Sequence, residues 1–148
     1  MDFVESLGLL GLFVICLLAS SLYPLGSEAF VVGFLALDYS WWIVWIVATL
    51  GNTFGALTTY GIGYFGNSLC QTHFKGAYEK LYRYEKGIQK RGFIYAFFSF
   101  LPLVGDVFAL GLGVYKYSWL KAIIFIALGK GARYLFVIAI YLKYQAIF

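Results

Sequence analysis

The sequence has little charge, and this sets the class of protein. Of its 148 residues only 12% are Asp, Glu, Lys or Arg, whereas about a quarter are charged in a soluble domain. Hydrophobic residues make up 62% of the chain. The stretch Trp41–Gly66 carries no charge over 26 residues, enough to cross a hydrocarbon core of roughly 30 Å. This composition excludes a sizeable soluble domain and predicts one all-α integral membrane domain, residues 1–148.

Residues that commonly carry chemistry are also scarce. The one histidine, His73, lies in a polar stretch with no Cys or carboxylate at metal-ligand spacing, so we expect no metal site. Cys16 and Cys70 are 54 residues apart, and we predict no disulfide. Neither G-x-S-x-G nor H-E-x-x-H occurs, so we expect neither enzymatic activity nor a cofactor. A signal peptide begins with positively charged residues, whereas this chain begins with the acids Asp2 and Glu5. We therefore expect the first apolar segment not to be cleaved off.

The chain has only two prolines, and they belong to an internal repeat. A shift of 78 residues, without a gap, places Pro24 on Pro102 and Glu28 on Asp106. The same shift aligns a further ordered set: Gly33 with Gly111, Tyr39-Ser40-Trp41 with Tyr117-Ser118-Trp119, and Leu50-Gly51 with Leu128-Gly129. Biased composition does not readily produce this order, so the pattern indicates a duplication.

Each copy begins with a broken helix. In the first, Leu7–Leu22 is apolar and ends at the break formed by Pro24 and Gly26. Ser27 is the expected N-cap of a ten-residue helix, Glu28–Leu37, about 15 Å long. This is half a bilayer, so the pair predicts a re-entrant hairpin; the sequence leaves open whether Leu7–Leu22, the longer arm, is part of that hairpin or a full span.

The second copy repeats this order. An arm, Phe93–Leu101, leads to a break at Pro102 and Gly105, and Asp106 is the expected N-cap of Val107–Tyr115. A long apolar span follows each hairpin, Trp41–Gly66 in the first copy and Ser118–Leu142 in the second. Repeat 1 therefore covers about residues 7–66 and repeat 2 about residues 93–142.

Charge predicts how the repeats are oriented. One crossing helix per repeat would place the loop Asn67–Gly92 and the turn Lys116–Lys121 on one face, with eight Lys or Arg between them. The positive-inside rule makes that face cytoplasmic and puts both termini outside. The sequence thus predicts an inverted repeat with broken helices, an architecture of secondary transporters. We interpret the basic loop as a topology signal with an amphipathic surface helix (Tyr78, Leu81, Tyr82, Ile88), and not as a nucleic-acid site.

Four ionisable residues fall at membrane depth: Glu28, Asp106, Lys130 and Arg133. An intramembrane charge costs roughly 2.5–3.5 kcal/mol on insertion scales, so these side chains should face the interior. They could be structural salt bridges, but we favour a substrate and proton site that also includes Asn52. Helix N-termini and arginine bind phosphate, and protonating the two acids would leave a net charge of +2.

Several motifs resemble the DedA superfamily of SNARE-associated, or VTT-domain, proteins, and its YqaA-like branch in particular. They are Pro24-Leu25-Gly26-Ser27-Glu28, Gly51-Asn52-Thr53-Phe54-Gly55, Phe100-Leu101-Pro102-Leu103-Val104-Gly105-Asp106 and Gly129-Lys130-Gly131-Ala132-Arg133-Tyr134. The resemblance implies a bacterial inner-membrane protein with two opposed re-entrant hairpins, in a family implicated in flipping undecaprenyl phosphate, scrambling phospholipids and proton-dependent membrane homeostasis. Family members carry arginines where this chain has Ser99 and Gly105, and here the positive charges lie on the next helix.

Three hypotheses follow. The first is a flippase or scramblase for a phosphate-bearing lipid, either undecaprenyl phosphate or a phospholipid, coupled to protons. The second is a proton-coupled transporter of small ions or drugs, and the third is a membrane-homeostasis protein that transports nothing. The expected partners are anionic membrane lipids and protons. Small residues such as Gly51 and Gly55 favour helix packing, including a homodimer.

Overall fold

The computed structural model describes residues 3–21, 26–73, 87–98 and 105–147, and every element in these ranges is a helix. The helices are α1 (Phe3–Ser21), α2 (Ser27–Ala36), α3 (Trp41–His73), α5 (Gly105–Val114) and α6 (Trp119–Gln145), together with a helix over residues 87–97. The Trp41–Gly66 part of α3 and the whole of α6 are long and apolar enough to cross a membrane. The predicted all-α class is confirmed.

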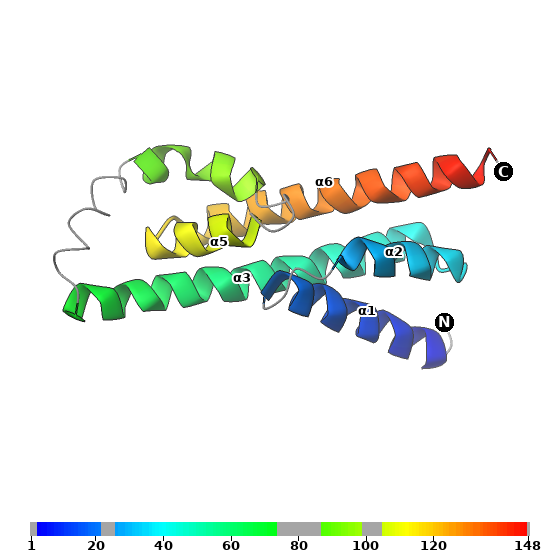
Figure 1. Ribbon diagram of the computed structural model, residues 1–148, viewed down its shortest axis with the longest axis horizontal. Helices are drawn as coiled ribbons and strands as arrows, with labels where there is room; N and C mark the ends of the chain where they lie inside the picture. Colours follow the sequence, from blue (N-terminus) through cyan, green and yellow to red (C-terminus); the bar gives the residue numbers. More distant parts are fainter. Residues whose placement is uncertain (1–2, 22–25, 74–86, 99–104, 148) are drawn as a thin grey trace.

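The helices form two antiparallel pairs beside two long helices. Figure 1 shows α3 and α6 running in opposite directions, with both termini at the same end of the molecule. From that end α1 runs toward the middle and α2 runs back, while residues 87–97 and α5 do the same from the other end. Pro24 and Pro102 lie outside the described residues, but Gly26 caps α2 and Gly105 begins α5.

The two halves of the chain have matching backbone geometry at the 78-residue offset. The bounds of α5 are those of α2 shifted by this offset. Asp38 and Lys116, equivalent turn residues, have the positive φ values 62° and 50°. Each turn closes with the same hydrogen bond, from Tyr39 N to Phe34 O and from Tyr117 N to Leu112 O, which is the pattern of a Schellman cap. The sequence duplication is therefore also present in the local structure.

Two buried clusters form the interior, and each takes residues from both halves. The first packs the α1–α2 pair against the start of α3 and the second half of α6: Leu12, Cys16, Val31, Leu35, Val44, Ala48, Tyr134 and Ile138. The second packs the other pair against α3 and the start of α6: Ala56, Tyr60, Ala96, Ala109, Leu112, Tyr117, Ala122 and Ile126. The polar residues considered below lie beside the first cluster.

Glycines bring α3 into backbone contact with two neighbouring helices, α1 and α5. A Cβ added at Gly51 would lie 2.5 Å from Phe13 O, and one at Gly55 would overlap Leu17 O, both on α1. On the other side, a Cβ at Gly113 of α5 would overlap Tyr60 O. Small residues permit such close approach in membranes, where dispersion forces and weak Cα–H···O bonds hold helices together.

Large apolar side chains cover the outside of the molecule. They include Leu10, Phe54, Phe65, Trp119, Leu128 and Phe136, each of which is exposed. A soluble protein rarely presents so continuous an apolar surface, but hydrocarbon matches it. Trp41 and Trp42 begin α3 and Trp119 begins α6, the helix-end positions where tryptophan sits at membrane interfaces.

Two predicted helix caps are wrong. Helix α2 begins at Ser27 and is capped by Gly26, with no side-chain cap bond. Ser27 is unavailable as a cap because its hydroxyl bonds Tyr134 of α6. Helix α5 begins at Gly105, since this residue already has helical geometry, and Asp106 therefore lies in the first turn rather than at the cap.

The predicted polar loop Asn67–Gly92 is too long at both ends. Helix α3 continues to His73, and residues 87–97 are already helical. The helix over residues 87–97 starts earlier than predicted because Ile88 packs on the second buried cluster and Gln89 Nε2 donates to Tyr115 O at 2.9 Å. Ile88 is therefore not on a separate surface helix, and Tyr78, Leu81 and Tyr82 lie outside the described residues.

Candidate functional site

Lys130 lies in the middle of α6 and is buried, with only 3% of its surface exposed. Its Nζ donates a hydrogen bond of 3.0 Å to Ser20 Oγ, at the end of α1. A buried ammonium group loses its hydration, so hydrogen-bond acceptors inside the protein must compensate. Lys130 therefore defines one side of the candidate site, next to the end of α1.

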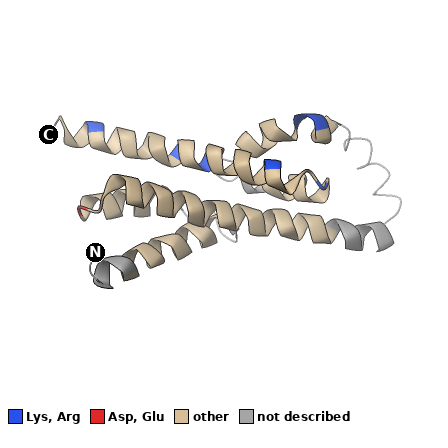
Figure 2. Ribbon diagram, turned by 180° about the vertical axis from the view of Figure 1, so that it is seen from behind, with Lys and Arg blue, Asp and Glu red and all other residues tan. Residues whose placement is uncertain are grey.

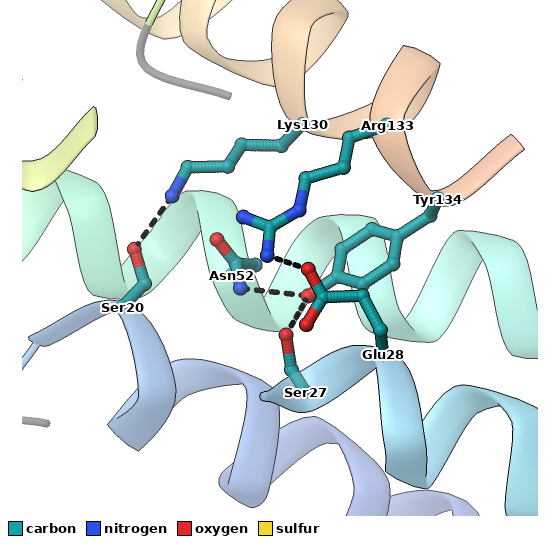
Figure 3. Close-up of polar contacts among 7 residues, drawn as sticks. All are labelled: Ser20, Ser27, Glu28, Asn52, Lys130, Arg133 and Tyr134. Atoms are coloured by element: carbon teal, nitrogen blue, oxygen red, sulfur yellow. Dashed lines mark hydrogen bonds and ion pairs between the residues drawn. The ribbon is translucent and has the colours of Figure 1, made fainter. Parts of the chain in front are cut away.

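Arg133 follows three residues later on α6 and forms an ion pair with Glu28 through Nη2 and Oε1 (Figure 3). The two side chains are 16% and 28% exposed, so the pair is more accessible than Lys130. Glu28 lies in the first turn of α2. Arg133 thus reaches the start of α2 while Lys130 reaches the end of α1, and the two cations bracket the break between these helices.

Tyr134 connects three helices beneath the ion pair. Its hydroxyl oxygen lies 2.7 Å from Ser27 Oγ and accepts a hydrogen bond of 2.7 Å from Asn52 Nδ2. Tyr134 is fully buried and Asn52 is 3% exposed. Figure 3 shows the three side chains converging from α6, α2 and α3 next to the carboxylate of Glu28. This network positions the helix that carries both cations.

The polar face of α3 has spare hydrogen-bonding capacity. Among the described residues, Asn52 Oδ1, Thr49 Oγ1 and Thr53 Oγ1 are buried without a hydrogen-bond partner. These residues are three and four positions apart, so they share one face of the helix. Buried polar atoms are normally satisfied, and unpaired ones can receive water or a polar group of a ligand.

Not every residue predicted for the site can be placed. The backbone of Asp106 is in the first turn of α5, but its side chain, like Pro24 and Pro102, lies outside what the structure describes. Whether this acid joins the two cations stays a prediction. Within the described part of the chain, no group of three His, Cys, Asp or Glu could hold a metal ion.

Sequence reasoning missed Ser20 and Tyr134. Tyr134 is four residues after Lys130, which places the two on one helix face. That spacing was the available signal. Ser20 carries no comparable signal, because its role depends on which side chain of α6 reaches the end of α1. Chemically, the whole arrangement offers two cations, one competing carboxylate and several hydroxyl and amide groups, a set suited to binding an oxyanion reversibly.

Comparison with known proteins gives clear relatives. The chain is 32% identical over 136 residues to the inner membrane protein YqaA of Escherichia coli K12, covering 91% of this chain and 92% of that protein. The same values hold for the inner membrane protein YqaA of Shigella flexneri. A Haemophilus influenzae protein described as uncharacterized is 36% identical over 91 residues, 60% of this chain and 54% of that protein. No family model matches the chain, and no solved structure matches it.

Proposed function

Because the chain belongs to the YqaA-like branch of the DedA superfamily of membrane proteins, we propose that it is an inner-membrane lipid transporter. In this proposal it acts as a flippase or scramblase and performs no chemical step. The substrate is a lipid with a phosphate headgroup, either undecaprenyl phosphate or a phospholipid. The site comprises Glu28, Asn52, Lys130 and Arg133, with Asp106 as a further acid.

One observation carries the proposal: two cations on one face of a membrane-spanning helix bracket the break in the first helical pair. Lys130 contacts the end of α1, and Arg133 contacts the start of α2. Salt bridges alone would explain Arg133 and Glu28, but two cations three residues apart in the middle of a membrane-spanning helix are an expensive way to join helices, because both must lose their hydration. An anion near the break, where the N-terminus of α2 also attracts negative charge, would stabilise both cations.

The ion pair suggests how protonation controls lipid binding. While Glu28 is ionised it occupies Arg133, so a phosphate must compete with it. Protonation of Glu28 removes this competitor, and the guanidinium can then exchange the carboxylate for a bidentate contact with the headgroup. Loss of the proton restores the ion pair and expels the lipid. Binding should therefore strengthen as pH falls, in the direction that protonates a carboxylate.

The proposal includes the membrane arrangement. The ten-residue helices α2 and α5 each rise about 15 Å, half a bilayer, which supports two re-entrant hairpins entering from opposite faces. Figure 2 shows Lys and Arg gathered at the end formed by residues 87–97 and the α5–α6 turn. These residues are Lys90, Arg91, Lys116 and Lys121. We assign this end to the cytoplasm and both termini to the outside, so that the two repeats are inverted.

A vesicle assay tests the site. The purified protein is reconstituted with fluorescent phosphatidylglycerol, and lipid movement is followed by quenching of the outer leaflet between pH 5 and 8. Loss of a charge-assisted contact of about 1.5–3 kcal/mol predicts that Arg133→Gln lowers the rate about 10–100-fold. Arg133→Lys should retain part of it, because lysine cannot bind bidentately. Lys143→Gln, in the last turn of the same helix, is the matched control and should behave like the wild type.

The proton step has its own test in the same vesicles. Glu28→Gln should transport at high pH as well as the wild type does at low pH, because the competing charge is gone. If Glu28→Gln and Asp106→Asn both kept the rate and the pH dependence of the wild type, the proton mechanism would be refuted. Proton-driven ion flux without lipid movement would identify a small-ion transporter, and the absence of both would favour a role in membrane homeostasis.

A further inference from the structure

A groove of about 390 Å³ lies outside this polar cluster, between the helix over residues 87–97 and α5. Its volume is within the roughly 300–1,000 Å³ of ligand pockets. The lining residues that matter for the argument are Ile88, Arg91, Tyr95, Phe108, Gly111 and Tyr115. None of these belongs to the site of Glu28 and Arg133, so the groove is a separate feature of the second helical pair.

The groove follows from the spacing of residues on two facing helices. Ile88, Arg91 and Tyr95 share one face of the first helix, at intervals of three and four residues. The rings of Tyr95 and Phe108, 5.7 Å apart between centroids, join this face to α5. Gly111 leaves the floor open, because nothing lies within 4 Å of the position that its Cβ would take. The result is a largely apolar groove.

Charge distinguishes this groove from another apolar groove on the molecule. Among the described residues that line the groove, Arg91 is the one that carries a charge; it is exposed and lies at the basic end of the molecule. A second groove of about 320 Å³, between α2 and α6, has no charged residue among its lining side chains Val32, Phe136, Val137, Ile140, Tyr141 and Tyr144. Of these two grooves, the first combines an apolar lining with a cation.

We propose that the groove between residues 87–97 and α5 binds an anionic phospholipid, with one acyl chain along Tyr95, Phe108 and Gly111 and the phosphate at Arg91. The occupant is a lipid because the apolar groove opens on an apolar, membrane-facing surface, and its headgroup is anionic because the adjacent residue is arginine. This inference does not rest on the proposed transport, since a bound lipid of this kind would be present whether or not the protein moves lipids.

Photo-crosslinking tests the headgroup. Nanodiscs contain equal amounts of phosphatidylglycerol and phosphatidylcholine, and a trace of one of them carries a diazirine in its acyl chain. Adducts are located by mass spectrometry. We expect phosphatidylglycerol adducts on groove residues to fall about tenfold or more in Arg91→Gln, because a direct charge-assisted contact with the phosphate is lost. Lys90→Gln removes the same charge one residue away, outside the lining, and should change them little.

A second pair of variants tests the apolar groove. Gly111→Leu fills the open floor and should abolish groove adducts of both lipids. Gly33→Leu is the control, because Gly33 is the equivalent residue in α2 and is equally open. The proposal is overturned if Lys90→Gln and Arg91→Gln have equal effects, or if Gly111→Leu keeps its groove adducts. These outcomes are independent of Arg133, so they are distinguishable from failure of the transport site.

Discussion

Substituting Gly113 by alanine should separate α5 from α3. The new methyl group would overlap the carbonyl oxygen of Tyr60 and lie 2.9 Å from the backbone nitrogen of Tyr64. Both obstacles are backbone atoms of a continuous helix, so they cannot move aside by changing a rotamer. The two helix axes must therefore shift, which weakens the packing along the second buried cluster.

The magnitude can be estimated with a matched control. Forcing an extra carbon into a tight contact costs about 1–3 kcal/mol. Replacing glycine by alanine within a helix also gains about 0.5–1 kcal/mol. Gly111→Ala gains the same propensity on the same helix but meets no atom within 4 Å. The difference in free energy of unfolding between the two variants isolates the clash, so we expect Gly113→Ala to be less stable by about 1–3 kcal/mol.

Thermal unfolding in detergent, followed by circular dichroism, measures this difference. With about 2–4 °C per kcal/mol for a chain of roughly this length, the melting temperature of Gly113→Ala should lie about 2–12 °C below that of Gly111→Ala. Equal melting temperatures would show that α3 and α5 are not in backbone contact, and the helix packing described for this end of the molecule would be wrong.

Two further substitutions test hydrogen bonds that join the helices. Tyr134→Phe leaves Ser27 and Asn52 without their shared partner, and a loss of about 0.6–1.7 kcal/mol per bond in chemical unfolding is expected; unchanged stability would contradict the network. Tyr60→Phe removes the 2.5 Å bond to Tyr117 O, and faster amide hydrogen exchange in the turn around Tyr117 should follow while the turn at Asp38 stays as in the wild type; equal change in both turns would exclude a local role for this bond.

The order of the helices was predictable because it depends on local signals. Pro24 and Pro102 mark the breaks, and the 78-residue repeat relates two equally long short helices and two equivalent turns. The predicted start of α2 was wrong by one residue, because Ser27 bonds to another helix and does not act as a cap, and that of α5 was wrong by two, because Gly105 is already helical. A tertiary partner of this kind cannot be derived from the residues near Ser27 alone.

Charge alone indicated only part of the site. The pairing of Glu28 with Arg133 follows from opposite charges at membrane depth, and the structure places these side chains together. The contact of Lys130 with Ser20 was not predictable, since a serine near the end of an apolar helix has many alternative roles. At the 78-residue offset Lys130 and Arg133 align with Asn52 and Gly55, so the two cations have no basic counterparts in the first repeat.

The glycine contacts divide the molecule into a rigid group of helices and one helix that is packed against it less tightly. Because α1 and α5 touch α3 through backbone atoms, these three helices should move as one rigid body. The α3–α6 contact is softer at Gly131, where an added Cβ would meet side-chain atoms of Thr49 and Trp45 at 3.4 Å and 3.5 Å. Side chains can change rotamer, but Trp45 Nε1 donates to Gly131 O and Asn52 Nδ2 to the Tyr134 hydroxyl, so a movement of α6 against this frame would have to break these two bonds. Any opening of the polar site should therefore displace the helix that carries Lys130 and Arg133, while the frame stays still.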